Sequence, residues 1–74
     1  ERMEEFMFLG LRLTEGVSGA EFLRRFGQNM WNVYGPVMED MEAKGLLKVE
    51  HPRVFLTERG MDLSNYVMSR FLLD

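Results

Sequence analysis

Glycine residues divide the first two thirds of the sequence into separate helical segments. In residues 1–13, apolar side chains recur at the three-and-four spacing of one helix face, and Gly16 follows where this pattern stops. Ser18 is a good N-cap for a second helix, and Glu21 three residues later completes a capping-box pattern. We expect this second helix to stop at Gly27, because glycine is the usual residue just past a helix end.

A third helix is predicted to start near Pro36, because proline is tolerated in the first turn, and to end at Gly45. Residues 28–34 are then expected to form a less regular connector. Its two large aromatic residues, Trp31 and Tyr34, either anchor a neighbouring domain or close the small core of this one.

The last third of the sequence predicts a hairpin followed by a final helix. Residues 47–50 and 53–57 read as two short strands, joined by His51-Pro52. Thr57 is the expected N-cap of the last helix. Its predicted apolar stripe consists of Met61, Ser64, Val67 and Phe71.

Together these segments predict a single domain, residues 1–74, in the order helix–helix–helix–strand–strand–helix. The fold class is mostly α with a small β-hairpin (α+β), and the order is winged-helix-like. Gly10, inside the first predicted helix, costs about 1 kcal/mol relative to alanine. A close helix crossing at Gly10 would explain its presence.

The residue types exclude several kinds of site. The sequence has no cysteine, so it forms neither a disulfide nor a thiolate metal site. The only histidine, His51, is expected to be a solvent-facing turn residue, and the carboxylates to lie on solvated helix faces. Core filling is the favoured role of five methionines at helical core spacing: Met3, Met7, Met38, Met41 and Met61. We therefore assign no catalytic, cofactor-binding or metal residue, and we do not expect this chain by itself to be an enzyme.

No apolar run approaches the ~20 residues of a membrane span, and no signal peptide precedes the first helix. We therefore expect no membrane partner and a cytoplasmic setting. The oligomeric state is left open. The first residue is Glu1 and not methionine, which leads us to expect a domain excised from a larger parent.

The winged-helix-like order raises DNA binding as an alternative function. The third helix would be the element that enters the major groove, but its charged residues sum to −2. They are Glu39, Asp40, Glu42 and Lys44, and the whole chain is −3. Because DNA binding requires cations to replace condensed counterions, we expect no nucleic-acid partner.

Two segments at opposite ends of the chain resemble a known family. They are residues 5–13, EFMFLGLRL, and residues 56–73, LTERGMDLSNYVMSRFLL. Residues 20–27, AEFLRRFG, and 45–47, GLL, extend the match. In this order they resemble the C-terminal domain of the oxygen-independent coproporphyrinogen III oxidase family, radical S-adenosylmethionine proteins that include a heme-chaperone branch.

This resemblance implies an accessory C-terminal domain that packs on the catalytic barrel of its own parent. The family's barrel holds a [4Fe–4S] cluster and S-adenosylmethionine and decarboxylates coproporphyrinogen III to protoporphyrinogen IX during heme synthesis. The parent would then be an oxidoreductase, or alternatively a heme chaperone. Because this chain lacks the family's cluster cysteines, the resemblance places these cofactors in the missing barrel.

The resemblance also singles out individual residues. Six are characteristic of the family and are expected to have internal structural roles: Glu5, Gly10, Thr57, Gly60, Ser64 and Asn65. Arg12 is the candidate for contact with the barrel or with substrate propionates, because a guanidinium binds carboxylates in a bidentate fork. The alternative role for Arg12 is an ion pair within the domain, with Glu5 or Glu15.

Overall fold

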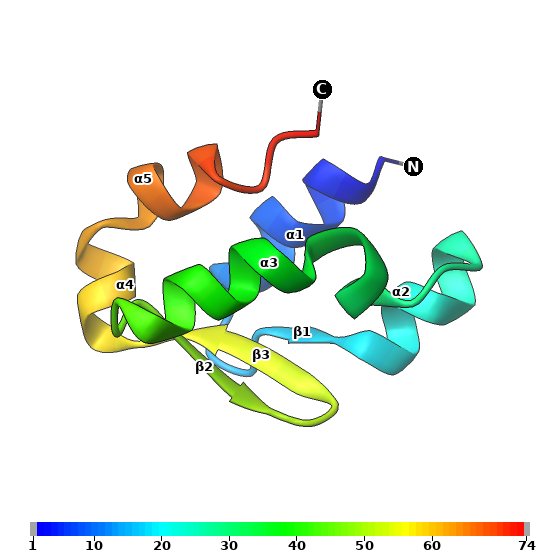
Figure 1. Ribbon diagram of the computed structural model, residues 1–74, viewed down its shortest axis with the longest axis horizontal. Coiled ribbons are helices and arrows are strands. Elements are labelled where there is room, and N and C mark those ends of the chain that lie inside the picture. The colour runs from blue at the N-terminus through cyan, green and yellow to red at the C-terminus, as the bar shows by residue number, and fades with distance from the viewer. Residues whose placement is uncertain (1, 74) are drawn as a thin grey trace.

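The computed structural model describes residues 2–73. Their elements are α1 (Met3–Leu11), β1 (Val17–Ser18), α2 (Gly19–Phe26), α3 (Met30–Ala43), β2 (Leu47–Glu50), β3 (Arg53–Leu56), α4 (Glu58–Asp62) and α5 (Ser64–Ser69). The predicted α+β class is confirmed. A small sheet lies along one side of the helices, and the segment that follows α5 lies near α1 (Figure 1). None of the helices in residues 2–73 has the length and apolar character needed to cross a membrane.

The sheet has three antiparallel strands in the order β1-β3-β2, one more than predicted. The predicted hairpin is present as β2 and β3, with Leu47 opposite Leu56. The additional strand, β1, pairs Val17 with Val54. Gly16 brings β1 close to β3: its φ is 71°, and a Cβ there would run into the Val54 carbonyl. A strand of two residues is too short to show an alternating pattern, so periodicity does not detect it.

The predicted ends of α2 are confirmed. Ser18 Oγ accepts the Glu21 backbone N–H at 3.4 Å, and Gly27, with φ 69°, donates to the Leu23 carbonyl at 2.8 Å. The Glu21 carboxylate pairs with Arg24 and Arg25 of its own helix. The hydrogen bond to Ser18 that belongs to the capping box is therefore present, while the Glu21 carboxylate pairs with these two arginines.

The predicted start of the third helix was wrong. α3 begins at Met30, so most of the expected connector is helical and Pro36 lies inside the helix. Asn29 explains the earlier start, because its side-chain oxygen accepts the Trp31 N–H at 2.8 Å and caps the helix. Burial then favours continuing the helix past Pro36, since Met30, Tyr34, Met38 and Met41 all face the core.

The last helix is divided in two, which also differs from the prediction. Thr57 caps α4 as expected, accepting the Gly60 N–H at 3.0 Å. The helix then breaks at Leu63, whose φ and ψ of −110° and 31° are not helical. Because of this break, Val67 and Phe71 reach the core, whereas Met61 is 41% exposed and does not fill it.

Gly10 lies where α1 meets β1. A Cβ at Gly10 would collide with Val17 Cγ1, so the expected helix crossing is instead a close approach of a helix and a strand. Within the core, the Phe22 ring packs edge-on to the Tyr34 ring with their centroids 6.2 Å apart. The Tyr34 hydroxyl donates to the Phe71 carbonyl at 2.9 Å. The two aromatic residues of the expected connector therefore serve this domain: Tyr34 is buried, and Trp31 packs against the core.

Candidate functional site

The outer side of α1 carries exposed leucines. Met7 and Leu11 face the core, but Leu9 is 69% exposed and Leu13, just after the helix, is 54% exposed. A helix with apolar residues on several sides is usually buried on several sides. Within residues 3–11, Glu5 and Leu9 are exposed and the other side chains are buried or half-buried.

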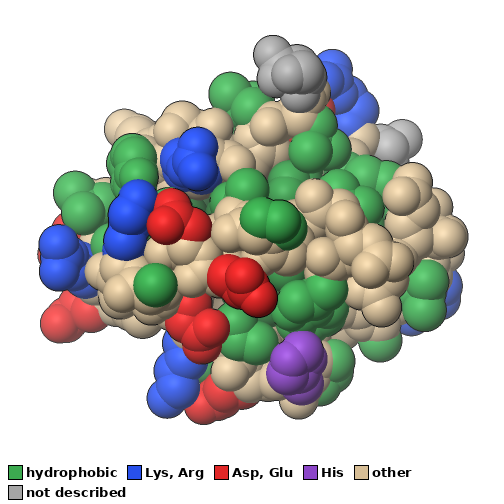
Figure 2. Space-filling model, viewed as in Figure 1, with side chains coloured by type: hydrophobic (Ala, Val, Ile, Leu, Met, Phe, Trp, Pro, Cys, Tyr) green, Lys and Arg blue, Asp and Glu red, His purple; other side chains and the backbone are tan. Residues whose placement is uncertain are grey.

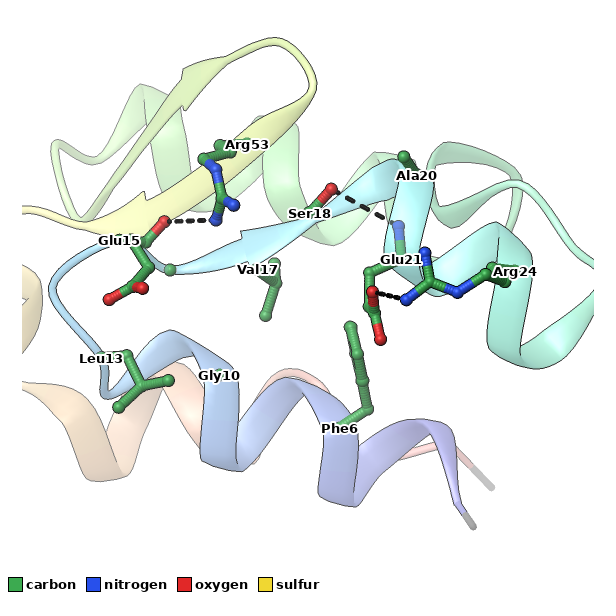
Figure 3. Close-up of a pocket in the computed structure, with 11 residues that line it drawn as sticks. Phe6, Gly10, Leu13, Glu15, Val17, Ser18, Ala20, Glu21, Arg24 and Arg53 are labelled. Carbon is green, nitrogen blue, oxygen red and sulfur yellow. Dashed lines mark hydrogen bonds and ion pairs between the residues drawn. The ribbon is translucent and has the colours of Figure 1, made fainter.

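A groove runs beside this face. Two adjoining hollows, of about 400 and 230 Å³, share Phe6, Gly10 and Leu13. Figure 3 shows Phe6, Gly10 and Leu13 on one side, and Val17, Ser18 and Glu21 on the other. We call this feature the α1 groove. Its full lining is Phe6, Leu9, Gly10, Leu13, Glu15, Gly16, Val17, Ser18, Ala20, Glu21, Arg24, Arg25 and Arg53.

Arginines form the polar wall of the α1 groove. Arg25 Nε donates to Glu21 Oε2 at 2.6 Å, and Arg24 pairs with the other oxygen of the same carboxylate. The hydrogen bond from Arg25, assisted by the charge of Arg24, holds the pKa of Glu21 below its usual value. The Arg25 guanidinium also lies over the Phe6 ring, 5.7 Å from its centroid.

Arg12 projects from the exposed end of α1. Its Nη1 lies 3.4 Å from the Phe8 carbonyl oxygen, as a donor. Within residues 2–73, no ion pair joins Arg12 to Glu5 or Glu15, so the alternative of an intradomain pair is not observed. The guanidinium therefore retains donors that face solvent.

The other family-characteristic residues are dispersed. Thr57 and Gly60 are joined by the α4 cap, and the Thr57 hydroxyl also donates to the Gly45 carbonyl at 2.7 Å. Gly60 packs so closely on the Leu46 carbonyl that a Cβ would collide with it.

Glu5 is exposed on α1, Ser64 is half-buried at the start of α5, and Asn65 is exposed. Among these residues, only Gly10 lies in the α1 groove.

Glu4 has a role that the sequence did not indicate. Its side chain is almost buried, pairs with Arg2 at 2.6 Å and accepts the Leu73 N–H at 2.8 Å. The Leu73 amide, followed by Arg2, lowers the pKa of this carboxyl. Burial, together with the charge of Glu4, raises the pKa of Tyr34 to about 12. Glu4 thus fastens the C-terminal segment to α1, a contact between residues too distant in sequence for a local pattern to reveal.

The side chains of this domain do not suit an iron–sulfur cluster. An iron–sulfur cluster requires thiolates, and the chain has no cysteine. His51 is exposed in the hairpin turn, where its ring stacks on Trp31 with the centroids 4.5 Å apart. Within residues 2–73, no three His, Asp or Glu side chains are grouped as metal ligands would be.

The surface around α3 is poorly suited to a nucleic acid. Acidic side chains lie across the middle of the face that includes α3 (Figure 2). Asp40 pairs with Lys44 at 3.0 Å, so the one lysine at the end of this helix is already engaged. The hairpin tip is also pinned, because the Gly19 N–H donates to the Pro52 carbonyl at 2.7 Å. A hairpin that is held against its own domain has little reach towards the groove of a DNA duplex.

Comparison with known proteins links the chain to a family. A family profile described as the HemN C-terminal domain matches residues 1–63. The chain is 40% identical over 72 residues to a protein named heme chaperone HemW from Bacillus subtilis (strain 168), covering 97% of this chain. It is 36% identical over 73 residues to heme chaperone HemW from Lactococcus lactis subsp. lactis (strain IL1403), covering 99% of this chain. The chain spans about a fifth of the length of either relative (19%). No solved structure matches it significantly.

Proposed function

Because the chain belongs to the HemN C-terminal domain family, we propose that it is an accessory domain of a larger heme chaperone. One observation carries this proposal: nearly the whole chain aligns with two proteins named heme chaperones, yet it spans only 19% of each. The remaining four fifths of such a protein would bind and pass on the heme. This proposal includes the cytoplasmic setting expected from the sequence.

The role proposed for this chain is structural support of the heme-handling part. The side chains that could bind heme iron are few, which supports this role. The chain has no cysteine, and its one histidine stacks on Trp31 at the hairpin turn. The exposed leucines of α1 give the domain a surface to bury against the larger part. Arg12 is exposed and precedes Leu13 in the chain, and a carboxylate of the larger part can accept its donors.

The alternative from the sequence is a coproporphyrinogen III oxidase, whose parent barrel carries a [4Fe–4S] cluster and S-adenosylmethionine. Both relatives are named heme chaperones, which favours the chaperone. An anaerobic assay decides: the full-length protein is incubated with coproporphyrinogen III and S-adenosylmethionine, and the tetrapyrroles are separated by chromatography. We expect no decarboxylated product. Catalytic conversion to protoporphyrinogen IX would overturn the chaperone assignment in favour of the oxidase.

We also propose that the domain has no nucleic-acid partner. The acidic α3 surface and the pinned hairpin support this. Fluorescence anisotropy with labelled duplex DNA at low salt tests it directly, since electrostatic binding is strongest there. Micromolar binding would contradict the charge argument.

A further inference from the structure

We infer that the open edge of β2 pairs with the same strand of a second copy of this chain, in an antiparallel, two-fold symmetric contact centred on Val49. The contact joins the two three-stranded sheets into one continuous sheet. It goes beyond the proposed function and does not depend on heme.

The sheet has one edge that is open to another strand. β2 lies at the end of the strand order β1-β3-β2, so one of its two sides has no strand beside it (Figure 1). The opposite edge is short and covered, because β1 has only two residues and α1 packs on it, with Gly10 close to Val17. β2 has four residues. An edge strand of this kind presents unpaired N–H and C=O groups that can pair with another strand.

The register of the hairpin shows which backbone groups of β2 point outwards. Leu47 lies opposite Leu56 of β3. Just beyond this pair, the Thr57 N–H donates to the Leu46 carbonyl at 3.1 Å. This bond makes Leu47 a non-hydrogen-bonded position, and because such positions alternate along an antiparallel ladder, Val49 is another. The N–H and C=O groups of both residues therefore point away from β3. Within residues 2–73, no turn, loop or cap hydrogen bond between backbone groups uses either residue.

Charge selects one register for the second β2. With Val49 opposite Val49 of the second copy, the two strands exchange a pair of backbone hydrogen bonds, and Lys48 of each strand faces Glu50 of the other. In the neighbouring register, with Leu47 opposite Val49, the two Lys48 side chains would face each other, which is unfavourable. The strand is therefore complementary to itself when the two-fold axis passes through Val49.

The side chains of β2 are free to make this contact. Lys48 and Glu50 pair within one strand at 3.2 Å, yet their side chains are 59% and 58% exposed. Such an exposed pair contributes little to stability, so each charge can turn to the other strand without a large loss. Val49 is half-buried against the core, and pairing would remove more of its surface from water.

The test measures the dimer dissociation constant of the full-length protein by sedimentation equilibrium. Because the contact is small, we expect a weak dimer whose population rises with concentration. Lys48→Glu places a glutamate opposite Glu50 at both ends of the contact, so the dissociation constant should rise about tenfold. Glu50→Lys should weaken the dimer similarly, by placing a lysine opposite Lys48. The combined variant restores opposite charges, and its constant should return close to that of the unmodified protein.

Arg59→Glu is the matched control, because it makes the same change in net charge at an exposed position of α4. We expect it to leave the dissociation constant unchanged. Glu50 also faces Arg53 of its own hairpin, so thermal unfolding followed by circular dichroism verifies that each variant keeps its fold.

Three results would overturn the inference. The first is a monomer at every concentration. The second is a dimer that Lys48→Glu leaves unchanged, because its contact would then lie elsewhere. The third is a loss in Lys48→Glu that the combined variant does not restore, because the two charges would then not face each other across the contact.

Discussion

The contact between Gly10 and Val17 allows a test of how α1 is held against the sheet. A methyl group at position 10 would occupy the space of Val17 Cγ1, whereas Val17 Cβ lies 3.6 Å away, at ordinary contact distance. Removing the Val17 methyl groups should therefore make room for the one added at Gly10. The perturbation is a double-mutant cycle of Gly10→Ala, Val17→Ala and the two combined.

The expected magnitudes follow from packing. Overpacking costs about 1–3 kcal/mol, and replacing a helical glycine by alanine returns about 1 kcal/mol, so Gly10→Ala alone should cost about 0–2 kcal/mol. Val17 is 2% exposed, and loss of its two buried methyl groups should cost about 1–3 kcal/mol. In the double variant the clash is gone and the cavity is filled, so it should be about 1–3 kcal/mol more stable than the sum of the two single changes.

The assay is thermal unfolding of the 74-residue chain, followed by far-ultraviolet circular dichroism. For a domain of this size, 1 kcal/mol corresponds to about 4–8 °C in melting temperature, which resolves the expected coupling. Urea unfolding provides an independent free energy for each variant. Additivity within about 0.5 kcal/mol would refute the reasoning, because it would mean that the two side-chain positions do not share one space.

Three further predictions concern single residues. Gly60→Ala should lower stability by about 1–3 kcal/mol in urea unfolding, because the new methyl group meets a backbone carbonyl just before β2 that no side-chain adjustment relieves. Tyr34→Phe should cost about 1–2 kcal/mol, since the Phe71 carbonyl loses its donor. Because the pKa of Tyr34 is raised from 10.0 to about 12, the free energy of unfolding of the unmodified chain should fall as pH rises through that interval, and less so in Tyr34→Phe. The ionised Glu4 stabilises the fold above pH 4.5, its ordinary pKa, and this contribution is lost as pH falls through its lowered folded pKa. Glu4→Gln should therefore flatten the fall in melting temperature on acidification, and the Leu73 amide should exchange faster at neutral pH.

Local signals in the sequence predicted the parts of the fold that depend on local chemistry. Ser18, Gly27 and Thr57 are caps whose hydrogen bonds close within a few residues, and all three lie at the expected helix ends. The hairpin was likewise predicted from β-favouring residues on either side of the turn at His51.

The errors arose where tertiary packing overrides local preference. Pro36 predicts a helix start, but burial of Tyr34 and Met38 favours a longer α3 with proline in its interior. Leu63 carries no breaking signal, yet the chain bends there so that α5 reaches the core.

The candidate site was predictable only in part. The wide apolar surface of α1 can be seen in the sequence, and Phe6, Leu9 and Leu13 line the α1 groove, whereas Arg12 is not part of the lining. The groove itself depends on β1, a two-residue strand, and on arginines from α2 and β3 that come together only in the folded chain. No sequence pattern therefore indicated which residues line the groove.

The central claim is that this domain supports a heme-handling protein without holding heme itself. The most direct measurement is a heme titration, followed by the Soret absorbance, of the full-length protein and of the 74-residue chain side by side. We predict saturable, stoichiometric binding by the full-length protein and only linear, unsaturated uptake by the chain alone. One equivalent of tightly bound heme on the isolated chain, lost in His51→Ala, would contradict it.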